Sequence, residues 1–221
     1  MHVSAFRRVK IFVKLTPLIG LLVVCTLPAD TGLDGILSKV EDHYNRAKTL
    51  EVQFTEQYTP PGSIRRMESG KLLLRKPGKM RGEYSQPQGK LFISDGKSLW
   101  LYTPDDHRAQ KMPLKNTEDL RAPLAFLLGK LHFTKEFRNL AAHPEGSLTR
   151  ITAEPKTDSL PYSNVEFVVA PDGRIQELKV TGLDRSVLDF TFQQEKDDPR
   201  LDARLFEFQL PQGAVLEETA Q

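Results

Sequence analysis

The stretch Leu50-Glu51-Val52-Gln53-Phe54-Thr55-Glu56-Gln57-Tyr58 indicates the fold class, because its hydrophobic and polar residues alternate. A period of two places the hydrophobic members on one face of an extended strand and the polar members on the other. The stretch therefore predicts a β-strand with one buried face.

Turn residues divide most of the remaining chain into further short strands. Pro60-Pro61-Gly62 ends the first strand, and Asp95-Gly96-Lys97 and Pro171-Asp172-Gly173 are typical hairpin turns. The further strands are expected at residues 69–75, 80–85, 91–94, 98–102, 137–141, 147–153, 165–169, 178–180, 188–192 and 206–210. About eleven short strands at this spacing predict a mainly β (α+β) protein with an antiparallel sheet large enough to curl.

Two segments are expected to be helical. Hydrophobic residues recur every three or four positions between Leu33 and Ala47, which gives one apolar stripe. The segment from Asn116 to Gly129 is short and apolar all round. It must therefore pack against another part of the protein, and we expect Leu127 and Leu128 to face the sheet.

The first 29 residues have the composition of an export signal. Four basic residues precede the 13-residue apolar run Leu15–Leu27, and a plausible cleavage site follows. A transmembrane helix needs about 20 apolar residues. We therefore expect residues 1–29 to be a cleaved signal peptide and residues 30–221 to be one domain. A twin-arginine signal at Arg7-Arg8 and lipid attachment at Cys25 are the alternatives.

Removal of the signal changes the charge of the chain. Residues 1–29 hold four of the 31 Lys and Arg residues and no Asp or Glu, so the remainder has 27 basic and 29 acidic residues, a net charge of −2. This balance argues against binding to nucleic acid. Cys25 is the only cysteine, which excludes an internal disulfide.

The sequence carries none of the common catalytic motifs. The chain has no HExxH, GxSxG, Walker A or GxGxxG motif. We therefore expect no enzyme, no metal site and no cofactor. A basic cluster is present, and we interpret it as the solvent face of two strands or as a patch that meets lipid head groups or an acidic partner: Arg65, Arg66, Lys71, Arg75, Lys76, Lys79 and Arg81.

Four stretches together resemble the LolA family, the periplasmic carriers of outer-membrane lipoproteins. The first is Gly70-Lys71-Leu72-Leu73-Leu74-Arg75-Lys76-Pro77-Gly78-Lys79-Met80-Arg81-Gly82-Glu83-Tyr84. The second is Ser94-Asp95-Gly96-Lys97-Ser98-Leu99-Trp100-Leu101-Tyr102-Thr103-Pro104, and the third runs from Pro123 to Leu128. The fourth is Phe206-Glu207-Phe208-Gln209-Leu210-Pro211-Gln212-Gly213-Ala214. Their order and spacing are similar to the family pattern from about Leu33 to Val215.

The resemblance implies an unclosed antiparallel β-barrel whose concave side is covered by a helical lid. It implies that residues 30–221 form a single lipoprotein-carrier domain in the periplasm and that acyl chains occupy the cavity. The partners would be outer-membrane lipoproteins, an inner-membrane releasing complex and an outer-membrane receptor, and the carrier would be a monomer. A related barrel that acts as an anchored receptor or an envelope sensor is the alternative.

The resemblance also implies the residues of the cavity and lid. A basic residue before the proline of the first motif, usually Arg, helps to control opening, and this position falls on Lys76. Gly82 stands where the family often has a bulky aromatic residue, which suggests a reshaped cavity. The residues expected to line the cavity and lid are Tyr44, Phe54, Leu72, Leu74, Lys76, Met80, Trp100, Leu127 and Leu128.

Overall fold

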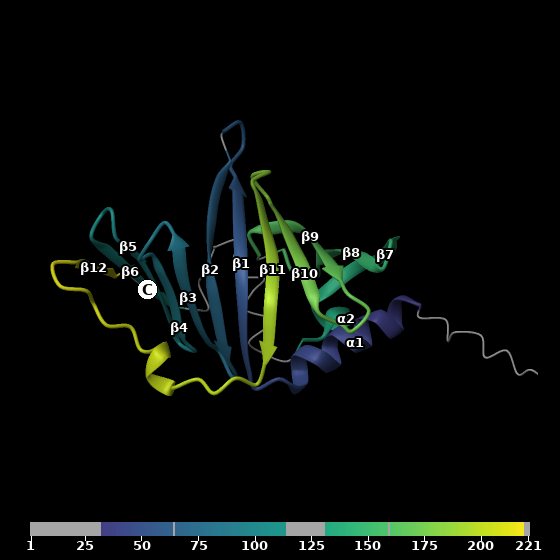
Figure 1. Cartoon of the computed structure of the whole chain (residues 1–221). Helices are drawn as coiled ribbons and strands as arrows, with labels where there is room; N and C mark the ends of the chain where they lie inside the picture. Colours follow the sequence, from purple (N-terminus) through teal and green to yellow (C-terminus); the bar gives the residue numbers. More distant parts are fainter. Residues whose placement is uncertain (1–31, 64, 114–130, 159, 219–221) are drawn as a thin grey trace, which may run out of the picture. The chain divides into compact units, whose positions relative to one another are not determined.

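The computed structural model describes residues 32–63, 65–113, 131–158 and 160–218. The expected signal peptide and the expected helix over 116–129, with Leu127 and Leu128, lie outside the described residues. Figure 1 shows the arrangement of the described elements.

Within the described residues, twelve strands form one sheet, and three helical segments accompany it. The strands are β1 (Thr49–Thr59), β2 (Arg66–Arg75), β3 (Lys79–Gln86), β4 (Leu91–Asp95), β5 (Ser98–Thr103), β6 (Arg108–Pro113), β7 (Phe137–Glu145), β8 (Leu148–Pro155), β9 (Tyr162–Val169), β10 (Ile175–Gly182), β11 (Val187–Asp197) and β12 (Val215–Glu218). The helices are α1 (Leu33–Arg46), α2 (Phe133–Glu136) and the 3₁₀ helix η3 (Ala203–Phe206).

The sheet is open, as expected, and its order is β12-β6-β5-β4-β3-β2-β1-β11-β10-β9-β8-β7. On one side of β1 the strands follow in chain order from β2 to β6. On its other side β11 pairs with β1, and β10, β9, β8 and β7 follow toward the far edge, so β1 and β11 pair at the centre of the sheet. Neighbouring strands are antiparallel except β6 and β12, which are parallel. The mainly antiparallel open sheet confirms the predicted fold class.

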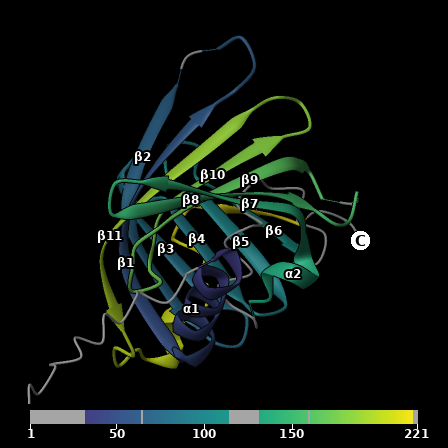
Figure 2. The same cartoon turned by 90° about the vertical axis from the view of Figure 1, so that its right-hand side faces the viewer.

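Helix α1 lies within the curve of the sheet, as Figure 2 shows. Its buried residues Leu37, Val40 and Tyr44 recur at helical spacing and form the apolar stripe that the sequence predicts. Gly173 in the β9–β10 turn has φ +91°, and a Cβ atom there would lie 2.7 Å from the Lys39 carbonyl oxygen. The turn therefore approaches the backbone of α1 at a distance that only glycine allows. Neither α1 nor any other helix in the described residues is long and apolar enough to cross a membrane.

The segment that follows β11 packs on the convex face, opposite α1. The strand predicted over 206–210 is wrong, because η3 ends at Phe206 and the residues after it are not in a strand. Phe206 is fully buried, whereas Leu210 is 45% exposed, so one aromatic side chain rather than an alternating face fixes this segment. Arg81 and Arg75 donate hydrogen bonds to the backbone carbonyls of Leu205 and Leu201, at 3.0 and 3.2 Å.

Candidate functional site

The concave face carries rows of apolar side chains across its central strands. Opposite residues of antiparallel strands point to the same side of a sheet. The register places Leu50, Leu74 and Met80 in one row and Val52, Leu72, Gly82 and Phe92 in the next. These side chains are buried, and the face they form is hydrophobic from β1 to β4.

Helix α1 closes over one half of this face. The space between Tyr44 and the sheet residues Leu50, Leu74 and Phe192 measures only about 10 Å³. A cavity of that size holds one water molecule at most, so α1 and the sheet are in direct contact. Leu101 and Met112 lie toward the other half of the same face and are only partly buried.

The structure brings most of the predicted site residues together on this side of the sheet. Leu72, Leu74 and Met80 lie in the apolar rows, and Tyr44 faces them from α1. Phe54 is on the same face of β1, where its ring packs edge-on against Tyr84 at 5.1 Å between ring centroids. Four further buried residues on this face were not among those that the sequence predicted to line the cavity: Leu50, Val52, Tyr84 and Phe92.

Lys76 connects the sheet to the end of α1. Its ammonium group donates a hydrogen bond to the backbone carbonyl of Tyr44, in the last turns of the helix. Carbonyls near a helix C-terminus lack intrahelical partners, and the helix dipole favours a cation beside them. Burial lowers the pKa of Lys76, and the Asp198 carboxylate opposes this shift. Lys76 thus provides one polar fastening between the sheet and α1.

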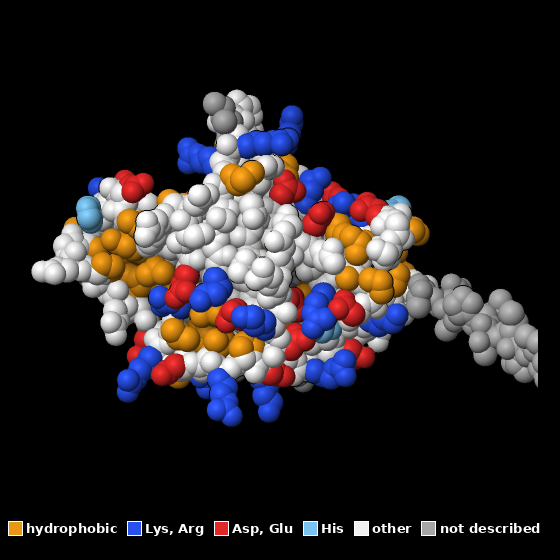
Figure 3. All heavy atoms as spheres, viewed as in Figure 1, with side chains coloured by type: hydrophobic (Ala, Val, Ile, Leu, Met, Phe, Trp, Pro, Cys, Tyr) orange, Lys and Arg blue, Asp and Glu red, His pale blue; other side chains and the backbone are white. Residues whose placement is uncertain are grey.

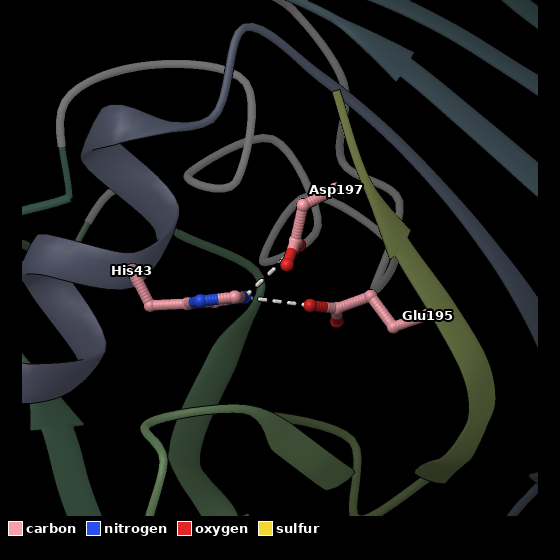
Figure 4. A group of neighbouring side chains, drawn as sticks. All are labelled: His43, Glu195 and Asp197. Carbon is pink, nitrogen blue, oxygen red and sulfur yellow. Dashed lines mark hydrogen bonds and ion pairs between the residues drawn. The ribbon is translucent and has the colours of Figure 1, made fainter. Parts of the chain in front are cut away.

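A second set of polar contacts fastens the same end of α1 to β11, as Figure 4 shows. His43 lies 2.7 Å from Glu195 Oε1 and 3.5 Å from Asp197 Oδ1. The Tyr44 hydroxyl donates to Glu195 Oε2 at 2.9 Å, and burial together with the Glu195 charge raises the pKa of that hydroxyl. The Arg174 guanidinium pairs with Glu195 and Asp197. Because the Arg174 cation already lies between the carboxylates of Asp172, Glu195 and Asp197, the cluster has the chemistry of an ion-pair clamp rather than of a metal site.

A sequence model of the family described as outer membrane lipoprotein carrier protein LolA matches residues 45–209. The match covers most of the sheet and both faces described above. The chain belongs to the LolA family.

Two relatives show how far the sequence has diverged within the LolA family. The outer-membrane lipoprotein carrier protein of Chromobacterium violaceum is 28% identical over 171 residues, which is 76% of this chain and 80% of the relative. The protein of the same name from Nitrosomonas europaea is 26% identical over 194 residues, 87% of this chain and 93% of the relative. An uncharacterized conserved protein from Thermus thermophilus has a similar fold, with a TM-score of 0.50, 14% identity, and coverage of 84% of this chain and 98% of that one.

Gly82, where the resemblance implies a bulky aromatic residue in other LolA proteins, lies beside two aromatic side chains. A Cβ atom at Gly82 would lie 3.5 Å from the Phe92 Cβ and 3.5 Å from the Tyr84 ring. These are ordinary contact distances, so the two aromatic side chains flank the glycine closely. Phe92 and Tyr84 thus occupy the space beside Gly82.

Trp100 lies apart from the other predicted cavity residues. In the register of β3, β4 and β5 it aligns with Ile93 and Arg81 on the convex face. Its ring stacks on Phe208 at 6.0 Å between centroids, with an interplanar angle of 13°. Trp100 therefore holds the C-terminal segment against the sheet, and we leave it out of the proposed cavity.

The concave face is charged toward the β1–β2 hairpin. Glu56 is 1% exposed and accepts a hydrogen bond from the Tyr84 hydroxyl at 3.0 Å. Lys90 is 7% exposed, pairs with Glu68 and lies 4.4 Å from the centre of the Tyr84 ring. Buried ionised groups are costly unless paired. The face therefore has an apolar part near α1 and a paired, charged part at the opposite ends of the strands.

A separate hollow on the convex face does not have the lining that an acyl chain requires. It has a volume of about 490 Å³ and is lined mostly by Gln, Thr and Ser side chains, among them Gln53, Thr55 and Thr191. Lipid-binding cavities are predominantly apolar. The concave face is thus the better candidate site despite the size of this hollow.

Proposed function

We propose that the protein is a periplasmic carrier that holds the acyl chains of outer-membrane lipoproteins against the concave face of its sheet. The observation that supports this most strongly is an apolar face closed by one helix whose polar contacts with other described elements lie in its C-terminal half, from Glu41 to Asn45. Membership of the LolA family supports the same proposal. Export would remove the first 29 residues, and the mature protein would be a monomer without catalytic activity.

The arrangement fits the energetic demands on a carrier. Burial of an acyl chain is worth about 0.8 kcal/mol per methylene, or roughly 10 kcal/mol for a whole chain. A carrier that retained all of this energy would not release its cargo. In the closed state the side chains of α1 occupy the apolar face, so the cargo must displace them, and this competition lowers the net affinity.

Opening of α1 would have to break the polar contacts at its C-terminal end. The C-terminal end is held by Lys76 and by the clamp of His43, Arg174 and Glu195. We propose that the helix swings or detaches when acyl chains enter, and that a releasing complex in the inner membrane and a receptor in the outer membrane act on this opening. Hand-over would then be driven by closure of α1 as the chains leave.

Titration with an acylated lipopeptide tests the proposal. We expect saturable binding of a triacylated cysteinyl peptide to the mature protein and no binding of the same peptide without its acyl chains, because the concave face is apolar. Equal binding of the two peptides, or binding of neither, would contradict the carrier function. A lipid-modified Cys25 in the exported protein would instead favour an anchored receptor.

A further inference from the structure

The basic cluster of the sequence separates into groups with different surroundings. Lys71 and Arg81 pair with Glu83 at 3.4 and 2.7 Å, and Lys76 is bonded to α1. Arg65 and Arg66, by contrast, are exposed and form no ion pair with any residue that the structure describes. Lys79 also forms no ion pair with a described residue, but it is only partly exposed and lies opposite Arg75, at the Lys76 end of the strands. Arg65 and Arg66 are thus the exposed members of the cluster that remain available to an external partner.

The two arginines lie on a hairpin that projects beyond its neighbours. Strand β2 pairs with β1 as far as Arg66, but its pairing with β3 stops at Ser69. The residues between them have a partner strand on one side only, and Met67 is 68% exposed. Figure 1 shows the β1–β2 hairpin rising above the adjacent turns.

The β10–β11 turn adds to the same end of the molecule. Thr59 pairs with Val187, so the turn before Val187 lies beside the end of β1. Leu183 in this turn is 66% exposed and Arg185 is exposed. Figure 3 shows Lys and Arg side chains gathered over the hairpin, whereas basic and acidic side chains are mixed at the opposite ends of the strands. We call this surface the basic tip, and it consists of Arg65, Arg66, Met67, Leu183 and Arg185 together with the exposed Asp184 between the last two. Three arginines against one aspartate leave the basic tip with a net charge of +2.

We propose that the basic tip docks the protein on anionic phospholipid membranes. Guanidinium groups bind phosphate oxygens in a bidentate manner, and exposed Met and Leu side chains can enter the interfacial region of a bilayer. A specific protein partner usually covers about 800 Å² of each surface, and the narrow end of a two-stranded hairpin is poorly suited to that. The exposed Met67 and Leu183 among the arginines suit a lipid surface better than they suit a protein partner.

Docking of this kind is weak and depends on salt. Each basic residue near an anionic surface strengthens binding by about fivefold, and salt screens the attraction. A carrier that visits two membranes benefits from contacts that form and break quickly. The tip lies at the end of the sheet opposite Lys76 and the clamp on α1, so membrane contact leaves that end of the helix accessible.

The test is co-sedimentation of the full mature chain with vesicles. We compare vesicles of equal parts phosphatidylglycerol and phosphatidylcholine with vesicles of phosphatidylcholine alone, at low and high salt. The wild type should bind the anionic vesicles at low salt. The double variant Arg65→Gln/Arg66→Gln should bind them about 25-fold more weakly, and Met67→Ser should bind several-fold more weakly. The matched control Lys97→Gln/Arg200→Gln removes the same charge from exposed positions at the opposite ends of the strands and should bind like the wild type.

The outcomes separate this proposal from the carrier function. Lipopeptide affinity is measured on every variant and should not change, which also shows that each variant is folded. Absence of wild-type binding to anionic vesicles, or an equal loss in the tip and control variants, would overturn the proposal. Unchanged vesicle binding in the tip variants, together with slower transfer to a protein acceptor, would assign the basic tip to a protein partner instead.

Discussion

Leu101→Glu is expected to weaken the binding of an acylated lipopeptide by about 100-fold. Leu101 lies opposite Phe92 on the concave face and is only partly buried in the closed state. A carboxylate placed among acyl chains costs about 3 kcal/mol on a membrane-insertion scale, and 1.4 kcal/mol is a factor of ten in affinity. Because the side chain is not fully buried before cargo enters, the variant should fold. Isothermal titration with the lipopeptide measures the change.

The neighbouring residue provides a matched control for this prediction. Trp100→Glu adds the same charge to the same strand but on the convex face, where it breaks the stack on Phe208. It should lower the free energy of unfolding by roughly 2 kcal/mol and leave the lipopeptide affinity within a few-fold of wild type. If Trp100→Glu loses binding while Leu101→Glu keeps it, the cargo lies on the convex face and the site assignment is wrong.

Lys76→Leu is expected to load normally but to transfer its cargo about 10 to 100 times more slowly. The Lys76 ammonium holds the closed position of α1 through the Tyr44 carbonyl. A charge-assisted hydrogen bond of this kind is worth about 1.5–3 kcal/mol, which is small beside the burial of acyl chains but large for a balanced opening equilibrium. Without it the open, loaded state is favoured and release slows. Transfer from preloaded protein to an acceptor is the measurement.

Lys76→Arg is the control for the charge at that position. It should transfer at a rate close to wild type, because a guanidinium can donate to the same carbonyl. Loading is assayed separately for both variants. If Lys76→Leu fails to load and yet transfers normally whatever it has bound, Lys76 belongs to a docking surface and not to the fastening of α1.

The sequence predicted those elements whose local pattern is strong. The alternation in Leu50–Tyr58 appears in the structure as β1, and Pro171-Asp172-Gly173 forms the β9–β10 turn with glycine at positive φ. Strand β6 was missed because the apolar side chains of Arg108–Pro113, which are Ala109, Met112 and Pro113, do not alternate with polar ones. Strand β12 was also missed, since its pairing with β6 joins residues more than one hundred positions apart.

The candidate site was predictable where alternation identifies a face, and only there. In Leu99-Trp100-Leu101-Tyr102 every residue is hydrophobic, so periodicity cannot say which side chains face the cavity. The register of β4 and β5 places Trp100 on the convex side. Glu56 and Lys90 were missed for another reason, since charged residues are normally expected in solvent and only the folded sheet brings their partners beside them.

Native mass spectrometry of the protein recovered from the periplasm, after expression with its own export signal, shows directly whether it carries lipoprotein acyl chains. We expect a chain that begins between Thr26 and Asp30 and carries acylated lipoprotein or its lipid fragments in a one-to-one complex. We also expect that Leu101→Glu, purified in the same way, carries no such ligand. Recovery of the intact chain from the cytosol alone, or of a wild-type chain with no lipid in the presence of abundant lipoproteins, would show that the protein is not a periplasmic lipoprotein carrier.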